Sequence, residues 1–343
     1  MKITNTLNII ALLLSLLLFV GCEKEVDDER LRVTPENIEI GYEGGTAQVD
    51  IESTSGWKVI VPSNCTWVTS DRYESEVGHR QWIKLTISKN TKSTRKATIT
   101  ISNRGQSCDI TINQDAPTYT ETVNGLNLKM IFVRGGTFAI GSNDGQDDER
   151  PVHTVKLDSY HIGETEITQA QWQAIMGSNP SSYKGDNRPV ECVSWNDAQE
   201  FCKKLSALTG KKYVLPTEAQ WEYAARGGNK SKGYTYSGSN SVDEVAKYDS
   251  SGGHSNVKSK KPNELGIYDM SGNVWEWCSD WSGNYSTSPQ TNPQGPSSGY
   301  FRVERGGGWL NSAGNCRVAN RSSNSPSYRG DNYGFRVVCL PVD

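Results

Sequence analysis

The chain of 343 residues has little histidine and no excess of positive charge. Its four histidines lie far apart and include no pair with the spacing of metal ligands. Lys and Arg number 36 against 39 Asp and Glu, and a net charge of -3 gives no basic field, so nucleic acid is not an expected partner. A length of 343 suggests two domains. The histidines are His79, His153, His161 and His254.

Long apolar runs are missing apart from one near the N-terminus. Residues 9–20 are nearly all Ile, Leu, Val and Phe. This run is short for a bilayer span and fits the core of a signal peptide. The sequence Phe19-Val20-Gly21-Cys22 that ends it resembles a bacterial lipobox, which predicts removal of residues 1–21 and acylation of Cys22. An ordinary signal peptide with an incidental cysteine is the alternative.

The expected location follows from this N-terminus. Two or three acyl chains anchor a protein stably in a membrane, whereas one chain holds only marginally. Residues 22–30 are rich in Asp and Glu and are expected to form an acidic tether. Such a start resembles the surface-export signal of Bacteroidetes-type lipoproteins. We therefore expect an outer-membrane lipoprotein that faces the periplasm or the cell surface.

Residues 31–116 show short apolar alternations and no helical period. The alternations cover residues 46–51, 81–88, 97–101 and 108–112. They predict an all-β, immunoglobulin-like sandwich of antiparallel strands. The only two cysteines of this domain, Cys65 and Cys108, are expected to pair because export places the chain in an oxidising compartment. Residues 117–123 are polar and are predicted to be a linker.

Three short motifs of this domain suggest a family. They are Gly56-Trp57-Lys58-Val59, Thr66-Trp67-Val68 and Ile112-Asn113-Gln114-Asp115-Ala116. They resemble the Bacteroidetes-associated carbohydrate-binding often N-terminal (BACON) domain, which implies glycan binding. However, Trp57 and Trp67 lie in strand-like runs and are expected in the core. Trp82 shares a face with Lys84 and is expected to be more exposed.

Residues 124–343 form the second predicted domain, in which capping patterns mark three helices. Thr168, Ser194 and Thr217 are the predicted N-caps, and a glycine ends each helix. The rest consists of Gly-, Asn- and Ser-rich loops with short strands. So little periodicity would normally count against a compact domain. Metal ions, disulfides or buried tryptophans can hold such a chain together.

The second domain carries a series of motifs along its whole length. They are residues 130–138, Glu149-Arg150-Pro151-Val152-His153, Glu166-Ile167-Thr168, residues 189–195, residues 215–223, Gly272-Asn273-Val274-Trp275-Glu276-Trp277, Arg305-Gly306-Gly307 and Gly334-Phe335-Arg336. Together they resemble the formylglycine-generating enzyme, or sulfatase-modifying factor, family. The resemblance implies an α+β, C-type-lectin-like fold with little regular secondary structure. It also implies an enzyme that binds copper through two thiolates and oxidises a sulfatase cysteine with oxygen.

The two catalytic cysteines of that family are the test of this activity. In the enzymes a serine and then the first catalytic cysteine follow the Arg-Gly-Gly motif, and here Gly308 and Asn311 hold those places. Counting on without a gap puts Cys316 at the second place, but matching residues 317–321 to a later family segment removes that match. A lone cysteine cannot supply the two thiolates that Cu(I) prefers. Copper and formylglycine chemistry are therefore not expected.

Calcium is the expected metal. Residues 269–276 place two carboxylates around a glycine turn, and hard cations prefer oxygen ligands. In the family the matching positions bind calcium through the side chains of Asp269 and Glu276 and the carbonyls of Gly272 and Val274. The alternative is two solvated acids beside a buried tryptophan cluster.

The second domain has five cysteines, so pairing leaves one of them over. Cys202 matches a family cysteine that pairs near the C-terminal strand, so the resemblance implies a Cys202–Cys339 bridge. Cys278 and Cys316 both lie in the loop-rich half and are the other expected pair. Cys192 is then left over.

Two classes of function remain. We favour a non-catalytic binding or display protein, because residues 309–333 have the Asn-, Ser-, Gly-, Asp- and Tyr-rich composition of adaptable recognition surfaces. This segment also resembles diversity-generating variable proteins. The expected partner is an extracellular protein or glycan. The alternative is formylglycine-generating oxidase activity that uses Cys316. The candidate binding residues are Asn311, Asn315, Asn320, Asn324, Tyr328 and Tyr333.

Overall fold

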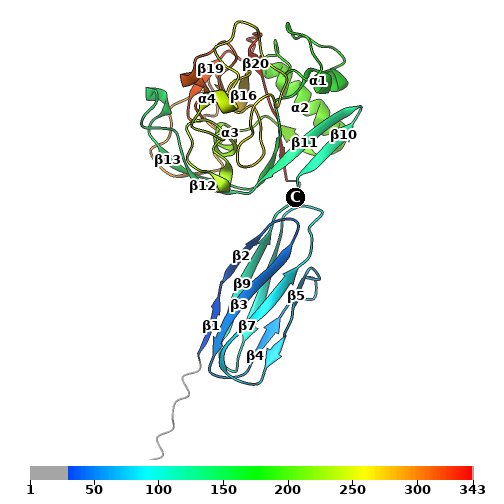
Figure 1. The fold of residues 1–343 in the computed structure, drawn as a ribbon, viewed down its shortest axis with the longest axis vertical. Helices are drawn as coiled ribbons and strands as arrows, with labels where there is room; N and C mark the ends of the chain where they lie inside the picture. The colour runs from blue at the N-terminus through cyan, green and yellow to red at the C-terminus, as the bar shows by residue number, and fades with distance from the viewer. Residues whose placement is uncertain (1–29, 342–343) are drawn as a thin grey trace, which may run out of the picture.

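The computed structural model describes residues 30–341 and divides them into two bodies. Figure 1 shows a narrow β-sandwich, drawn in blue and cyan, below a larger domain that contains all the helices. The predicted signal peptide, the Cys22 acylation site and nearly all of the acidic tether lie outside the described residues. Among residues 30–341, no helix is long and apolar enough to cross a membrane.

The first domain consists of two sheets with a shared core. Alternate residues of each strand are buried, so the apolar sides of the sheets face each other. All pairs are antiparallel except one, because β2 runs parallel to β9. One sheet has the order β1 (Leu31–Thr34), β3 (Gly45–Ser53), β7 (His79–Ile87) and β5 (Val68–Ser70). The other has the order β2 (Asn37–Ile40), β9 (Ser107–Gln114), β8 (Arg95–Ser102), β4 (Trp57–Ile60) and β6 (Glu74–Ser75).

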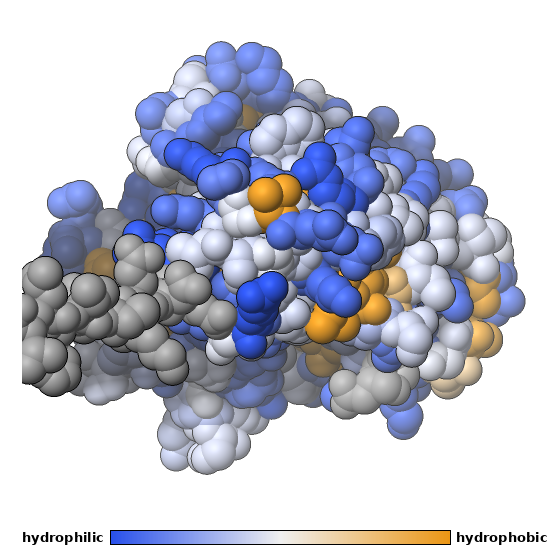
Figure 2. Space-filling model, turned by 90° about the horizontal axis from the view of Figure 1, so that it is seen from below, coloured by the Kyte–Doolittle hydropathy of each residue, from blue (hydrophilic) through white to orange (hydrophobic). Residues whose placement is uncertain are grey.

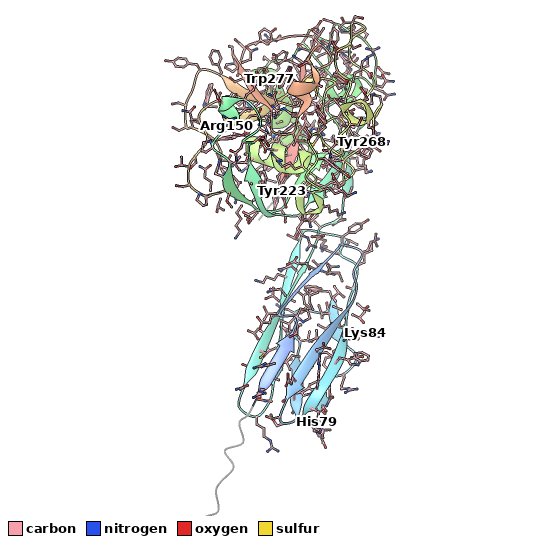
Figure 3. All side chains as sticks on the ribbon, turned by 60° about the vertical axis from the view of Figure 1, so that its left-hand side comes forward. His79, Lys84, Arg150, Tyr223, Tyr268 and Trp277 are labelled. Atoms are coloured by element: carbon pink, nitrogen blue, oxygen red, sulfur yellow. The ribbon has the colours of Figure 1, made fainter. Side chains whose placement is uncertain are left out.

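The three tryptophans of this domain lie as their sequence context predicts. Trp57 is buried in the core, and Trp67 packs against the core while the Arg95 guanidinium lies 4.3 Å from its ring centroid. Trp82 is 56% exposed on the outer face of β7. In Figure 3, His79 marks the end of the sandwich far from the second domain, and Lys84 lies on its side.

The first sheet of the second domain begins earlier than the sequence suggests. Residues 117–123 are not a free linker, because β10 (Tyr119–Val123) pairs along its full length with β11 (Leu126–Val133). The polar side chains of β10 alternate on a half-exposed edge strand, a pattern that resembles a linker. The sheet has the order β10, β11, β14 (Tyr160–Gly163), β21 (Val338–Leu340) and β15 (Lys212–Val214).

The three predicted helices are confirmed, with the predicted caps. Thr168, Ser194 and Thr217 each accept a hydrogen bond from the backbone N–H three residues later. Gly177 and Gly210 adopt the left-handed conformation that ends the first two helices. The helices are α1 (Gln169–Met176), α2 (Trp195–Thr209) and α3 (Glu218–Ala225), and α4 (Val242–Val245) is a single turn.

The remaining strands build two small sheets around α3. One has the order β12 (Gly136–Ile140), β13 (His153–Leu157) and β17 (Gln290–Thr291). The other has the order β19 (Arg321–Asn324), β18 (Arg302–Arg305), β16 (Trp275–Trp281) and β20 (Tyr333–Gly334). Single turns of 3-10 helix cover Asp147–Glu149, Gly228–Lys230 and Ala313–Cys316.

Buried arginine–carboxylate pairs hold the loop-rich part of this domain together. The Arg305 side chain is fully buried and bonds Glu218 and Glu222 of α3. The Arg336 side chain is also fully buried and bonds Glu276 of β16. Each pair connects segments that are at least 60 residues apart in the chain.

Arg134 joins the two domains. Its Nε donates to Asp115 Oδ1 at 2.8 Å, and its Nη2 donates to the carbonyl of Ile40 at 3.1 Å. It also forms an ion pair with Glu39.

The face of the molecule in Figure 2 is mostly hydrophilic, with only scattered apolar side chains.

Candidate functional site

The turn after β18 contains Gly308 and Asn311, the residues that the family resemblance aligns with the serine and the first catalytic cysteine of the enzymes. Gly307 has a φ of +74°, and a Cβ there would lie 2.9 Å from the Asn315 carbonyl oxygen, so only glycine fits. Asn311 Oδ1 accepts hydrogen bonds from the Gly308 N–H at 3.0 Å and from the Trp275 indole N–H at 2.8 Å. Asn311 therefore holds the turn in place through its side-chain carbonyl oxygen.

Cys316 is buried under the same turn. Its Sγ lies 3.8 Å from the Ser312 carbonyl oxygen, and burial raises the pKa of its thiol to about 12. A thiol with such a pKa stays protonated at neutral pH and is a poor metal ligand and nucleophile. The turn thus carries an amide that is already hydrogen-bonded and a protonated thiol, neither of which is a soft anionic ligand.

The expected disulfides are not formed, since all seven described cysteines are free thiols. Neither Cys65–Cys108, Cys202–Cys339 nor Cys278–Cys316 is bridged. The thiols fill core positions or contact nearby groups instead: Cys108 Sγ lies 3.6 Å from the Leu31 carbonyl oxygen, and Cys339 contacts the Tyr119 hydroxyl. Export to an oxidising compartment predicts paired cysteines, but burial as small apolar side chains explains their positions here.

The leftover Cys192 is half-buried near the turn. It has a φ of +60°, and its Sγ lies 3.3 Å from the Ser182 hydroxyl. Burial raises the pKa of its thiol, so Cys192 is not an activated nucleophile.

The four predicted calcium ligands lie on one tight turn that leads into β16. Gly272 has a φ of +80°, and a Cβ there would lie 2.4 Å from the Lys247 carbonyl oxygen. Asp269 Oδ2 accepts the Lys258 backbone N–H at 2.7 Å. Both Glu276 oxygens accept from Arg336 at 2.6 Å, and one also accepts from the Trp221 indole.

Glu166 is a third carboxylate at this place, and the sequence analysis missed it. It accepts hydrogen bonds from the Asn273 side chain at 2.7 Å and from the Val274 N–H at 3.1 Å. Burial and the nearby charges of Asp269 and Glu276 raise the pKa of Glu166, and burial raises the pKa of Asp269 to about 6. Three carboxyl groups thus lie around the buried Arg336 guanidinium, whose charge lowers the pKa of Glu166 and Asp269 in turn.

The donor chemistry of this cluster suits a hard cation, but side chains alone do not complete a site. No group of three or more His, Cys, Asp or Glu side chains in residues 30–341 is arranged to hold a metal ion. The predicted ligand set consists of the Asp269 and Glu276 side chains and the carbonyls of Gly272 and Val274. Because both Glu276 oxygens already accept hydrogen bonds from Arg336, calcium would depend on the two backbone carbonyls and Asp269 as well.

Contacts link four of the predicted binding residues, and we call this group the recognition face: Asn311, Asn324, Tyr328 and Tyr333. The rings of Tyr328 and Tyr333 meet edge to face with centroids 5.0 Å apart, and the Asn324 amide lies 3.5 Å from the Tyr333 hydroxyl. Trp275 connects these residues to Asn311, because its indole bonds Asn311 and its backbone pairs with Tyr333. Tyr328 is 42% exposed.

The other two predicted binding residues differ from each other. Asn315 is half-exposed, and its Oδ1 accepts from the Ser312 hydroxyl at 3.2 Å. Asn320 is 0% exposed, so its assignment as a binding residue is wrong. The sequence gives no sign of this, because Asn320 lies in the same polar segment as its exposed neighbours.

A stack of aromatic side chains extends the recognition face. Arg302 pairs with Asn324 across β18 and β19, and its guanidinium lies 3.8 Å from the Trp195 centroid and 3.4 Å from the Trp281 centroid. The adjacent Tyr300 is 90% exposed. The run Tyr300-Phe301-Arg302 in a Ser- and Gly-rich loop was the signal that could have located this extension.

A carboxyl group lies beneath the tyrosines. The Tyr333 hydroxyl donates to Glu304 Oε1 at 3.3 Å, and burial raises the pKa of Glu304 to about 7. In Figure 3, Trp277, which pairs with Glu304 across β16 and β18, lies inside the second domain.

The β-rich second domain, with few helices and many loops, fits the class of C-type-lectin-like proteins. The chain belongs to the sulfatase-modifying factor enzyme 1-like domain family, whose model matches residues 114–340. This part of the resemblance is confirmed. The BACON-like character of the first domain stays a prediction.

The relatives of this domain carry different names. A formylglycine-generating enzyme from Streptomyces coelicolor and a chaperone protein, LppX, from Paenibacillus barcinonensis are each 34% identical, with 61% of this chain and 88% of each relative covered. The solved structure of Treponema denticola variable protein 1 is 36% identical, has a TM-score of 0.61, and covers 65% of this chain and 99% of its own. Family membership therefore does not decide between catalysis and binding.

Proposed function

We propose that this chain is an exported, lipid-anchored protein of the outer membrane that binds an extracellular protein or glycan through its second domain and does not generate formylglycine. The observation that carries the proposal is Asn311, which bonds Gly308 and Trp275 where the first catalytic cysteine of the related enzymes would be. An amide cannot replace a soft thiolate as a ligand of Cu(I).

The recognition face supports binding as the function. It combines the exposed Tyr328 with the half-buried Tyr333, Asn311 and Asn324, and such side chains make large contacts at a small cost in conformational entropy. Arg302 and the two tryptophans beside it add the residue types that dominate binding energy at protein interfaces. The similarity to a protein that is named as variable agrees with a fixed core that carries changeable surface residues.

A second candidate function is formylglycine-generating oxidation. Two observations favour it: relatives bear that name, and Cys316 falls at the second catalytic place when no gap is introduced. The burial of the Cys316 thiol argues against it.

Binding should depend on the recognition face and not on the first domain. The full chain is tested on an array of extracellular proteins and glycans, and Tyr328→Ala should weaken binding to its main ligand at least about tenfold, as expected for a central aromatic residue. The matched control is Trp82→Ala, which removes another exposed aromatic side chain, on the sandwich. Retained binding by Tyr328→Ala together with loss in Trp82→Ala would assign recognition to the first domain instead.

We also propose that calcium binds at Asp269 and Glu276 with the carbonyls of Gly272 and Val274. A chelator should then lower the melting temperature of the wild type, because a ligand at 100 times its Kd stabilises the folded state by about 2.7 kcal/mol. Asp269→Ala should remove the response, whereas Asp147→Ala, a change at an exposed carboxylate, should keep it. If the chelator leaves the wild type unchanged, no calcium is bound there.

A further inference from the structure

A cavity of about 290 Å³ lies between the end of β16, the start of α3 and the loop of residues 283–296. Its floor consists of polar side chains that are at least nine-tenths buried: His153, Glu218, Asp280 and Arg321. Its rim consists of exposed polar side chains, among them Asn284 and Gln290. The lining includes none of the four residues that define the recognition face and none of the predicted calcium ligands, although Trp281 in its wall also contacts Arg302.

Two of the floor residues neutralise each other. Arg321 donates to Glu218 from Nε at 2.8 Å and from Nη2 at 2.7 Å. Glu218 also accepts from Arg305 at 2.9 Å and from the Tyr285 hydroxyl at 3.1 Å. Neither Glu218 nor Arg321 therefore has a free charge to offer a ligand.

Asp280 is different, because one of its oxygens is free. Its Oδ2 accepts from the Glu218 N–H at 3.0 Å and from the Ser279 hydroxyl at 2.9 Å. Oδ1 accepts no hydrogen bond from residues 30–341. Burial and the charge of Glu218 raise the pKa of Asp280 to about 7, so near neutral pH this carboxyl can either accept or donate a hydrogen bond.

The lining disfavours charged ligands of either sign. An anion would meet the carboxyl groups of Glu218 and Asp280. A cation would meet the Arg321 guanidinium, which lies 4.2 Å from the Tyr285 centroid and occupies the ring face that a cation would use. The lining therefore favours a neutral ligand with several hydroxyl groups.

The rim supplies matching hydrogen-bonding groups. The Asn284 side chain makes no hydrogen bond within the described part of the chain. The side-chain carbonyl oxygen of Gln290 lies within hydrogen-bond distance of His153 Nε2, at 3.1 Å, so the side-chain NH₂ group is available. The rings of Trp281 and Tyr285 form part of the wall and can pack against C–H groups.

We propose that this cavity binds one neutral polyhydroxy unit of the size of a single sugar residue, with Asp280 as its buried hydrogen-bonding partner and Asn284 and Gln290 at its mouth. Small-molecule sites typically measure roughly 300 to 1,000 Å³, so a cavity of this size admits a single small unit. The buried polar floor fixes orientation, and the exposed rim provides the entrance.

Saturation-transfer NMR on the full chain tests this, with glucose, galactose, mannose and inositol as separate probes. At least one probe should receive saturation. Asn284→Ala, at an exposed position without a structural partner, should weaken its binding about fivefold, the value of one hydrogen bond. Asp280→Asn should weaken it further, and Thr287→Ala, an exposed neighbour outside the cavity, should change nothing.

Disaccharide probes distinguish the two sources of such a ligand. Binding of a disaccharide as tight as that of its monosaccharide indicates the end of a glycan, and binding of the monosaccharide alone indicates a free sugar. The proposal is wrong if no probe receives saturation, or if Asn284→Ala and Asp280→Asn bind like the wild type. Preference for acetate or methylammonium over all four neutral probes would also overturn it. None of the three substituted residues belongs to the recognition face.

Discussion

Replacing Arg336 with methionine should lower the free energy of unfolding by about 3–5 kcal/mol, because it leaves a buried carboxylate without its charge partner. Arg336 and Glu276 are both fully buried, and they share two hydrogen bonds of 2.6 Å. Glu166 and Asp269 lie close enough to add repulsion once the guanidinium is gone. Arg336 also donates to the carbonyls of Gly163 and Tyr268, so its loss leaves further buried groups unpaired.

The matched control is Arg329→Met. Arg329 also holds a carboxylate with two nitrogens, donating to Asp197 at 2.8 and 2.9 Å, but its side chain is 54% exposed. Exposed pairs contribute up to about 1 kcal/mol, so this variant should unfold nearly like the wild type. Urea unfolding in a chelator is followed by tryptophan fluorescence, since seven of the ten tryptophans lie in the second domain. Equal effects of the two substitutions would show that burial does not set the strength of the Arg336 pair.

A sulfatase-type peptide should emerge unchanged from incubation with the copper-treated protein and oxygen. The peptide carries the Cys-x-Pro-x-Arg motif, and mass spectrometry reports any conversion of its thiol to an aldehyde. We expect none, because Asn311 offers an amide oxygen already bonded twice and the Cys316 thiol has a pKa raised to about 12. A site that needs two thiolates is abolished when one is missing.

The formylglycine-generating enzyme of Streptomyces coelicolor provides the positive control for the assay. Cys316→Ser is the informative variant of this chain. If the wild type converts the peptide and Cys316→Ser does not, this chain is a formylglycine-generating oxidase, and the binding proposal loses its main support. If neither converts it, catalysis of this type is excluded under conditions in which a relative is active.

Local features of the fold were predictable because they depend on near neighbours in the chain. The caps at Thr168, Ser194 and Thr217 need only a hydroxyl and a backbone N–H three residues later. The strand alternation that exposes Trp82 depends on a period of two. The prediction of a linker at residues 117–123 was wrong because an edge strand with polar side chains has the same composition as a linker.

Contacts between distant residues were not predictable in this way. Glu166 joins the carboxylate cluster from a position 107 residues before its partner Asn273. Whether Asn320 is buried while Tyr328 is exposed depends on which strands cover the segment. The free cysteines show the same limit, since a count of thiols says nothing about which of them face each other.

The sequence alone was enough to predict the two-part organisation, the three helices and the family of the second domain. All of these follow from short-range patterns or from motifs read in order. Only the tertiary structure decided that buried arginines hold the loops, that Arg302 stacks between Trp195 and Trp281, and that Asp280 keeps a free oxygen in a small cavity. These outcomes depend on desolvation and on contacts between segments far apart in the chain, which no local pattern encodes.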